Sequence, residues 1–142
     1  MKGRKVSPKV VANVITLSFV ALFLLLIGAD ISPAYSPEDY TKIREAVPDE
    51  AFVKPKKDRV LLVFTRCEGY KHATIAHCAD AMKLLGEKTG AFKVVKSRDM
   101  SAFSEHNLKQ YDAICLDQTT RLKFKDPEMR KNLLDFVRKG KG

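Results

Sequence analysis

The last 84 residues of the chain alternate three short apolar runs with three stretches of helical periodicity, and this alternation restricts the fold more than any other feature. The first run, residues 60–64, is continuously apolar and of strand length, which is typical of a strand buried on both faces. Residues 92–95 and 113–116 form the second and third runs. The resulting β-α-β-α-β-α order predicts right-handed crossovers and therefore an α/β domain with a parallel sheet.

The helices between the apolar runs are bounded by recognisable start and stop residues. Apolar residues about one turn apart predict a helix over residues 75–88, with Gly90 as its left-handed stop. A shorter helix is expected over residues 104–110. Asp126 followed by Pro127 is an N-cap followed by proline at the first helical position, so the last helix should begin there.

The N-terminal segment has a different character from the rest of the chain. Sixteen of the twenty residues at 10–29 are apolar, and at about 1.5 Å per residue a helix of this length spans roughly 30 Å, the thickness of a bilayer core. A purely basic head precedes it, which is typical of retention on the cytoplasmic side. We expect either an uncleaved transmembrane anchor or a signal peptide cleaved near residues 27–34. Both alternatives predict a membrane-anchored or secreted protein with its domain on the extracytoplasmic side.

The net charge of +9 belongs in large part to that head, since four of the basic residues precede residue 10. From Asp30 onward 22 basic residues face 17 acidic ones, which leaves 22 − 17 = +5. No stripe of basic and aromatic residues is visible, so we expect no nucleic-acid partner.

Residues 30–58 contain four of the six prolines and connect the apolar segment to the alternating region. Ser36 followed by Pro37 predicts a short helix that ends at about Ala46. The chain therefore divides into a signal peptide or transmembrane anchor at 1–29, a linker or arm with a short helix at 30–58, and an α/β domain at 59–142.

Several segments of this domain together resemble the trehalose-utilisation (ThuA-like) family. The most specific is a strand that opens into a loop of the form Gly-aromatic-basic-His. The matching segments are residues 60–72, residues 86–92, residues 107–108 with 111–114, and residues 133–137 with 140–142. The resemblance implies a class I glutamine-amidotransferase-like fold, which is a three-layer flavodoxin-like parallel sheet. It also implies a role in carbohydrate utilisation. In this chain the N-terminal hydrophobic helix would precede that fold. In the family a further strand follows the final glycines, so we expect only the N-terminal half of the sheet: a partial domain from a fragment, a truncated reading frame or a degenerate copy.

Two polar loops should meet at the carboxyl ends of the first and third strands. If the strand order is 2-1-3-4-5, as the resemblance implies, the ligand crevice lies between these strands. Amides, hydroxyls and an arginine there suit a hydroxyl-rich ligand, and a histidine can transfer a proton near neutral pH. We therefore expect a carbohydrate ligand, with His72 as the catalytic residue. The expected ligand-binding residues are Arg66, Glu68, Tyr70, Gln118, Thr119 and Thr120.

Each of these residues also has a purely structural interpretation. His72 precedes a helix and could cap it or be a solvated loop residue, while Arg66 and Glu68 could be solvated or pair with each other. Thr119 and Thr120 could be N-cap or turn residues. Gln118 stands where many relatives have Asn, which leaves its ligand contact open.

Neither a cofactor nor a metal is expected. Cys67 has no recognisable base, and its spacing from the histidines fits no common zinc pattern. Three functions remain open at this point: a carbohydrate-metabolising enzyme, a non-catalytic sugar- or partner-binding module, and an inactive fragment. The oligomeric state also remains open.

Overall fold

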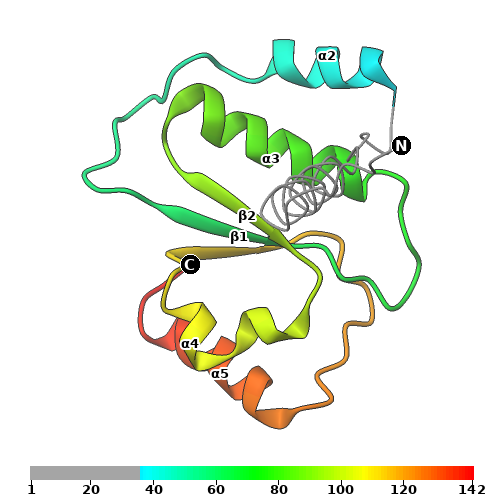
Figure 1. The fold of residues 1–142 in the computed structure, drawn as a ribbon, viewed down its shortest axis with the longest axis vertical. Helices are drawn as coiled ribbons and strands as arrows, with labels where there is room; N and C mark the ends of the chain where they lie inside the picture. The colour runs from blue at the N-terminus through cyan, green and yellow to red at the C-terminus, as the bar shows by residue number, and fades with distance from the viewer. Residues whose placement is uncertain (1–35) are drawn as a thin grey trace, which may run out of the picture. The chain divides into compact units, whose positions relative to one another are not determined.

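A three-stranded parallel sheet forms the centre of the computed structural model, which describes residues 36–142 (Figure 1). Its strands are β1 (Val60–Phe64), β2 (Lys93–Ser97) and β3 (Ala113–Leu116). The strand order is β2-β1-β3, and both pairings are parallel. This confirms the predicted α/β class and the expected order of the first three strands.

The central position of β1 explains its continuous apolar sequence. Leu62 is in register with Val95 of β2 on one side and with Ile114 of β3 on the other. Helices cover both faces of the sheet, so no residue in the middle of β1 can point to water. Leu62, Val63 and Phe64 are accordingly fully buried, each with 0% exposure.

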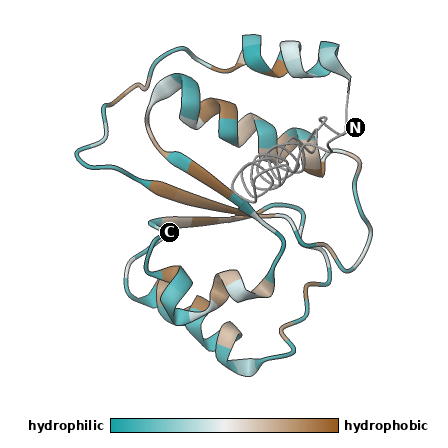
Figure 2. Cartoon of the chain, in the orientation of Figure 1, coloured by the Kyte–Doolittle hydropathy of each residue, from teal (hydrophilic) through white to brown (hydrophobic). Residues whose placement is uncertain are grey.

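The helices form two layers, one on each face of the sheet (Figure 1). The helix α3 (Ile75–Thr89) covers one face. The other face carries η1 (Met100–Phe103), α4 (Glu105–Leu108) and α5 (Pro127–Arg138). The apolar strands between these layers appear as the hydrophobic centre in Figure 2.

The main core lies between the sheet and the layer of η1, α4 and α5. Phe64 of β1 meets Phe103 of η1 edge to face, with ring centroids 4.6 Å apart. Phe136 of α5 belongs to the same buried cluster. Burial of side chains of this size stabilises the fold by about 1.5–3 kcal/mol each, so the core accounts for much of the stability of this layer.

The ends of the helices follow the residues that the sequence indicated. Gly90 ends α3 with a left-handed φ of 64°. The Asp126 side chain accepts a hydrogen bond from the Glu128 N–H at the start of α5. Both predictions are confirmed.

Two elements differ from the sequence expectation. The strand expected at residues 92–95 spans Lys93–Ser97 instead. The helix expected over residues 104–110 is shorter, because only Glu105–Leu108 is α-helical. The 3₁₀ helix η1 precedes it and was not expected; the Asp99 side chain caps its start by accepting from the Ser101 N–H at 2.9 Å.

The helix α2 (Pro37–Ala46) lies against α3, and Lys88 connects the two. Its Nζ donates to the carbonyls of Arg44 at 2.9 Å and Val47 at 2.6 Å, and it pairs with Asp49 at 2.8 Å. Lysine is favourable at a helix C-terminus, because the last carbonyls there carry partial negative charge. The expected short helix is therefore present, and it is attached to the domain through its C-terminal end.

The outer edge of β3 is hydrogen-bonded to Gly142. The Ile114 N–H donates to the Gly142 carbonyl at 2.8 Å, and the Gly142 N–H donates to the Asp112 carbonyl at 3.3 Å. Gly142 thus bonds to Asp112 and Ile114, the two neighbours of Ala113. This is the hydrogen-bond pattern of a parallel bridge between Gly142 and Ala113. The sheet is thus extended beyond β3 at this point.

None of the helices in residues 36–142 combines the length and the apolar character that a membrane crossing requires. The hydrophobic helix predicted within residues 10–29 lies outside the described residues.

Candidate functional site

The loops that follow β1 and β3 are joined by main-chain hydrogen bonds. The N–H groups of Glu68 and Gly69 donate to the Thr120 carbonyl at 3.2 and 2.9 Å. The thiol of Cys67 donates to the Tyr70 carbonyl at 3.1 Å and lies 3.7 Å from the Thr120 carbonyl. Because adjacent parallel strands end at the same edge of a sheet, the two loops predicted to form the site do meet.

Arg66 and Glu68 pair with each other within the first loop. The Arg66 Nε donates to Glu68 Oε1 at 2.9 Å, and a second guanidinium nitrogen lies 2.8 Å from the same oxygen. The other carboxylate oxygen accepts from the Lys123 N–H of the second loop at 3.2 Å. The hydrogen bond from Arg66 is the main reason that the pKa of Glu68 lies below its ordinary value. Glu68 therefore connects the two loops.

Gln118 connects the end of β3 to the start of α3. Its Nε2 donates to Asp117 Oδ1 at 3.2 Å and to Cys78 Sγ at 3.3 Å, and its Oε1 accepts from the Thr74 hydroxyl at 3.1 Å. Gln118 reaches these partners with a positive φ of 51°, a conformation that is uncommon outside glycine. The Gln118 side chain, which was predicted to contact ligand, therefore also holds the residues after β3 against the start of α3.

Asp117 is a residue of the site that the sequence analysis did not select. It directly follows β3, is only 8% exposed, and its N–H donates to the Phe64 carbonyl at 2.9 Å. Its Oδ2 is buried and has no hydrogen-bond partner within the described residues. Burial raises the pKa of this carboxyl, and the hydrogen bond from Gln118 opposes the shift. An acidic residue immediately after an apolar strand is the pattern that could have identified it.

Thr119 and Thr120 form the turn that receives the first loop. The Thr120 N–H donates to the Gln118 carbonyl at 2.9 Å, and the Leu122 N–H donates to the Thr119 carbonyl at 3.2 Å. Thr119 is half-buried and Thr120 is exposed. Their main chain therefore shapes the turn, and none of these hydrogen bonds uses their hydroxyls.

Tyr70 and His72 form the exposed part of the site. Tyr70 is 73% exposed, which is unusual for a ring of this size, and His72 is also exposed. Their rings meet edge to face with centroids 4.7 Å apart. An apolar face and two polar ring groups are thus presented together to solvent.

The model of the trehalose utilisation (ThuA) family matches residues 59–142, more than half of the chain. The chain belongs to this family. The match begins one residue before β1 and includes all three strands, the helices from α3 to α5, and the loops that follow β1 and β3. The comparisons with curated proteins and with solved structures found no match.

The cysteines of the ThuA domain are free and differ in their surroundings. Cys67 is buried, with 6% exposure, and its thiol faces main-chain carbonyls. Burial raises the pKa of Cys115, and the nearby charge of Asp117 adds to this effect. Within residues 36–142 no three His, Cys, Asp or Glu side chains are grouped closely enough to hold a metal ion.

Two cavities of the ThuA domain lie away from the predicted site. One of about 360 Å³ is lined by Pro55, Gly86 and Phe92, near the amino ends of β1 and β2. The other, of about 300 Å³, lies between α4 and α5. None of the residues predicted to bind carbohydrate lines either cavity.

Proposed function

We propose that the ThuA domain binds a carbohydrate of the trehalose type at the joined loops after β1 and β3, and that the protein acts in the utilisation of that sugar. The observation that carries this proposal is the exposed pair of Tyr70 and His72 beside a rim of hydrogen-bonding groups. An aromatic face can pack on the C–H groups of a sugar ring, while the phenol and imidazole hydrogen-bond its hydroxyls.

Some polar groups of the two loops are not used in hydrogen bonds among the described residues and can therefore bind a sugar. Arginine carries five N–H donors, and the contacts to Glu68 leave some of those of Arg66 free. Thr119 and Thr120 belong to the turn whose Thr120 carbonyl accepts from Gly69, a residue in the loop of Tyr70. In this proposal Tyr70 packs on the sugar, Arg66, Glu68, Gln118 and the two threonines bind hydroxyls, and His72 transfers a proton.

Sugar binding is tested by titrating the full chain, in micelles of a neutral detergent, with trehalose and following the heat of binding. Tyr70→Ala should weaken binding by about tenfold, since it removes the packing surface. Lys71→Ala, an exposed neighbour in the same loop, should leave binding unchanged. Equal binding by wild type and Tyr70→Ala would contradict the proposed location.

A second candidate function is a binding module without catalysis, and the surroundings of His72 favour it. Among the described residues, His72 has a ring contact with Tyr70, but neither of its ring nitrogens has a carboxylate partner to orient it. Catalytic histidines are commonly oriented by such a partner. Turnover of bound disaccharide that is lost in His72→Ala would support the enzyme, whereas binding without turnover in the wild type would support the module.

In the same proposal the domain lies on the extracytoplasmic side, either held by residues 10–29 or released after cleavage. Mass spectrometry of the protein isolated from cells distinguishes the two cases, because cleavage would remove the apolar segment. In a cell that has no outer membrane, protease added outside should digest an anchored domain on the extracytoplasmic side. A domain that stays intact under this treatment would contradict the proposed side.

A further inference from the structure

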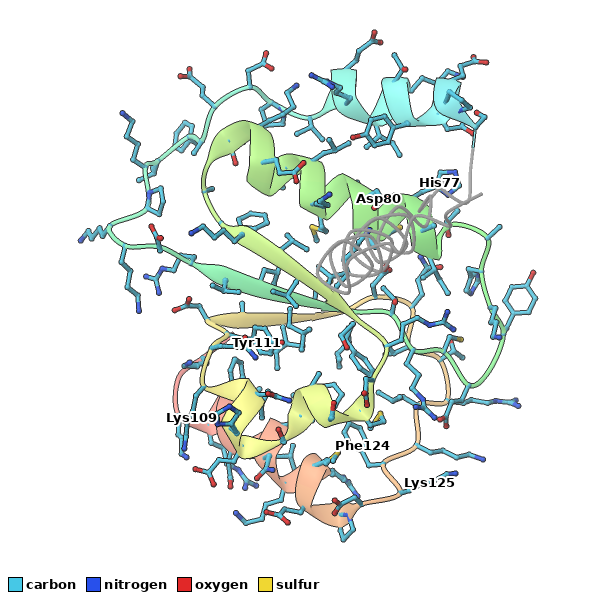
Figure 3. All side chains as sticks on the ribbon, in the orientation of Figure 1. His77, Asp80, Lys109, Tyr111, Phe124 and Lys125 are labelled. Atoms are coloured by element: carbon cyan, nitrogen blue, oxygen red, sulfur yellow. The ribbon has the colours of Figure 1, made fainter. Side chains whose placement is uncertain are left out.

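The cavity between α4 and α5 is lined by lysines from three segments. They are Lys109 after α4, Lys131 in α5, and Lys139 and Lys141 at and beyond the end of α5. Leu108 and Phe136 supply an apolar part of the lining. Figure 3 shows Lys109 on one side of this layer and Phe124 on the other. None of the residues that line the cavity belongs to the loops that follow β1 and β3, so the cavity is separate from the predicted site.

One of the lysines is held in place by the fold. The Lys141 Nζ donates to the Tyr111 carbonyl and lies 5.2 Å from the centre of the Phe136 ring. An ammonium group has three donors, so two remain for a ligand. Because the side chain is already ordered, a ligand loses less entropy in binding to it than to a freely moving surface lysine.

The charges that line the cavity do not cancel. Lys109 pairs with Glu105 at 3.1 Å, and Lys131 pairs with Asp135 at 2.7 Å. Lys139 and Lys141 take part in no ion pair within residues 36–142. Four lysines and two carboxylates leave 4 − 2 = 2 positive charges in the lining.

Three of these lysines contribute to the electrostatics of Glu105. The pKa of Glu105 is lowered first by the hydrogen bond and charge of Lys109, with further contributions from Lys139 and Lys131. Three ammonium groups therefore act on one carboxylate. The C-terminus of α5 adds only about half a negative charge, so the excess remains positive.

We propose that this cavity binds the phosphate monoester of a small molecule. The two unpaired ammonium groups match the two negative charges of a phosphate monoester, and charge-assisted hydrogen bonds to phosphate oxygens are strong. Leu108 and Phe136 can contact the organic part of the molecule, and about 300 Å³ is at the lower end of the volume of small-molecule sites. A phospholipid headgroup is usually a diester with one negative charge and matches the site less well.

Glycerol 3-phosphate tests the proposal on the full chain in micelles of a neutral detergent, with backbone amide NMR shifts as the readout. We expect saturable shifts confined to residues 105–111 and 131–141. The uncharged control, glycerol, should cause none there. Loss of trehalose binding would not affect this result, because the two sites share no residues.

Charge variants then locate the site. The double variant Lys139→Gln and Lys141→Gln should bind glycerol 3-phosphate at least about tenfold more weakly, since both unpaired charges are lost. The matched control, Lys42→Gln with Lys125→Gln, removes equal charge elsewhere and should bind as the wild type does. Glu105→Gln should tighten binding several-fold, because Lys109 loses its competing partner.

Three results with glycerol 3-phosphate would overturn the proposal. They are shifts that do not saturate, equal affinity in the double variant and its control, and no tightening in Glu105→Gln. If the double variant fails to fold, Glu105→Gln alone decides. A diester probe, glycerophosphoglycerol, that binds as tightly as the monoester would assign the site to a lipid headgroup and would also overturn it.

Discussion

The Gly69 N–H donates to the Thr120 carbonyl at 2.9 Å, and a Cβ added to Gly69 would lie 3.2 Å from that same oxygen and 3.0 Å from Thr120 Cγ2. The two loops of the site can therefore approach this closely only with glycine at position 69. We predict that Gly69→Ala lowers the free energy of unfolding by about 1–3 kcal/mol and weakens sugar binding. Denaturant unfolding checks this, with Lys71→Ala expected within about 0.5 kcal/mol of wild type.

Gly86 and Gly90 bound the last turn of α3, and they are required for different reasons. A Cβ at Gly86 would lie 2.4 Å from the Phe92 carbonyl oxygen, whereas at Gly90 nothing lies within 4 Å and only the φ of 64° disfavours other residues. We predict that Gly90→Ala costs about 1 kcal/mol and Gly86→Ala about 2–3 kcal/mol, although alanine is the better helix former. The reverse order in thermal unfolding would show that α3 moves away from Phe92.

Asp112 should stabilise the fold at neutral pH. Its Oδ2 accepts from the Val60 N–H at 3.0 Å, and its Oδ1 lies within 3.3 Å of Lys57 and 3.2 Å of Arg59. These contacts, the Val60 N–H above all, lower its pKa below 3.8. Its contribution is therefore present above that value and is lost as the pH falls through the lower pKa of the folded state. Asp112→Asn should destabilise the protein at about pH 7, by an amount that shrinks toward about pH 3.

Asp117 should show the opposite pH dependence, because burial raises its pKa in the folded state. Its favourable contribution is complete below the unfolded value and is lost as the pH rises through the folded pKa. Relative to wild type, Asp117→Asn should therefore gain stability as the pH rises from about 3 to about 7, while the Gln118 contact can persist. Urea unfolding of Asp112→Asn and Asp117→Asn from about pH 3 to about pH 7 tests both predictions. Curves that shift in the same direction would show that Asp117 is charged and solvated in the folded protein.

The strands of the fold could be predicted to the extent that burial dictates their sequence. The runs at 60–64 and 113–116 have the predicted bounds. In β1, which lies between two strands and two helical layers, burial requires an apolar residue at every position. β2 is an edge strand whose Lys93 and Lys96 are exposed, so its apolar pattern is weaker and its bounds were displaced. η1 has four residues and depends on a single cap at Asp99, too little for a periodic pattern to show.

The site could be predicted as a meeting of loops, but the partners of its side chains could not. Parallel strands that are neighbours in a sheet end at the same edge, so the expected strand order predicts that the two loops are adjacent. Whether Arg66 binds Glu68 or a ligand depends on side-chain geometry that sequence spacing leaves open. The positive φ of Gln118 accompanies its side-chain contacts with Thr74 and Cys78, and Asp117 is buried by the folded chain around it; both depend on tertiary structure and lie beyond local sequence.

The reactivity of the three cysteines reports directly on whether the loops stay joined. Cys78 is exposed, Cys115 is half-buried with a raised pKa, and the Cys67 thiol is enclosed by the carbonyls of Tyr70 and Thr120. Since the thiolate is the reacting form and the reagent must reach it, iodoacetamide should modify Cys78 at least about tenfold faster than the other two. Peptide mass spectrometry of the native full chain measures the rates, and labelling in denaturant, where the three should react similarly, is the control. Fast modification of Cys67 in the native protein would mean that the first loop opens away from Thr120. In that case the carbohydrate site would form only on ligand binding, and trehalose should slow the reaction at Cys67.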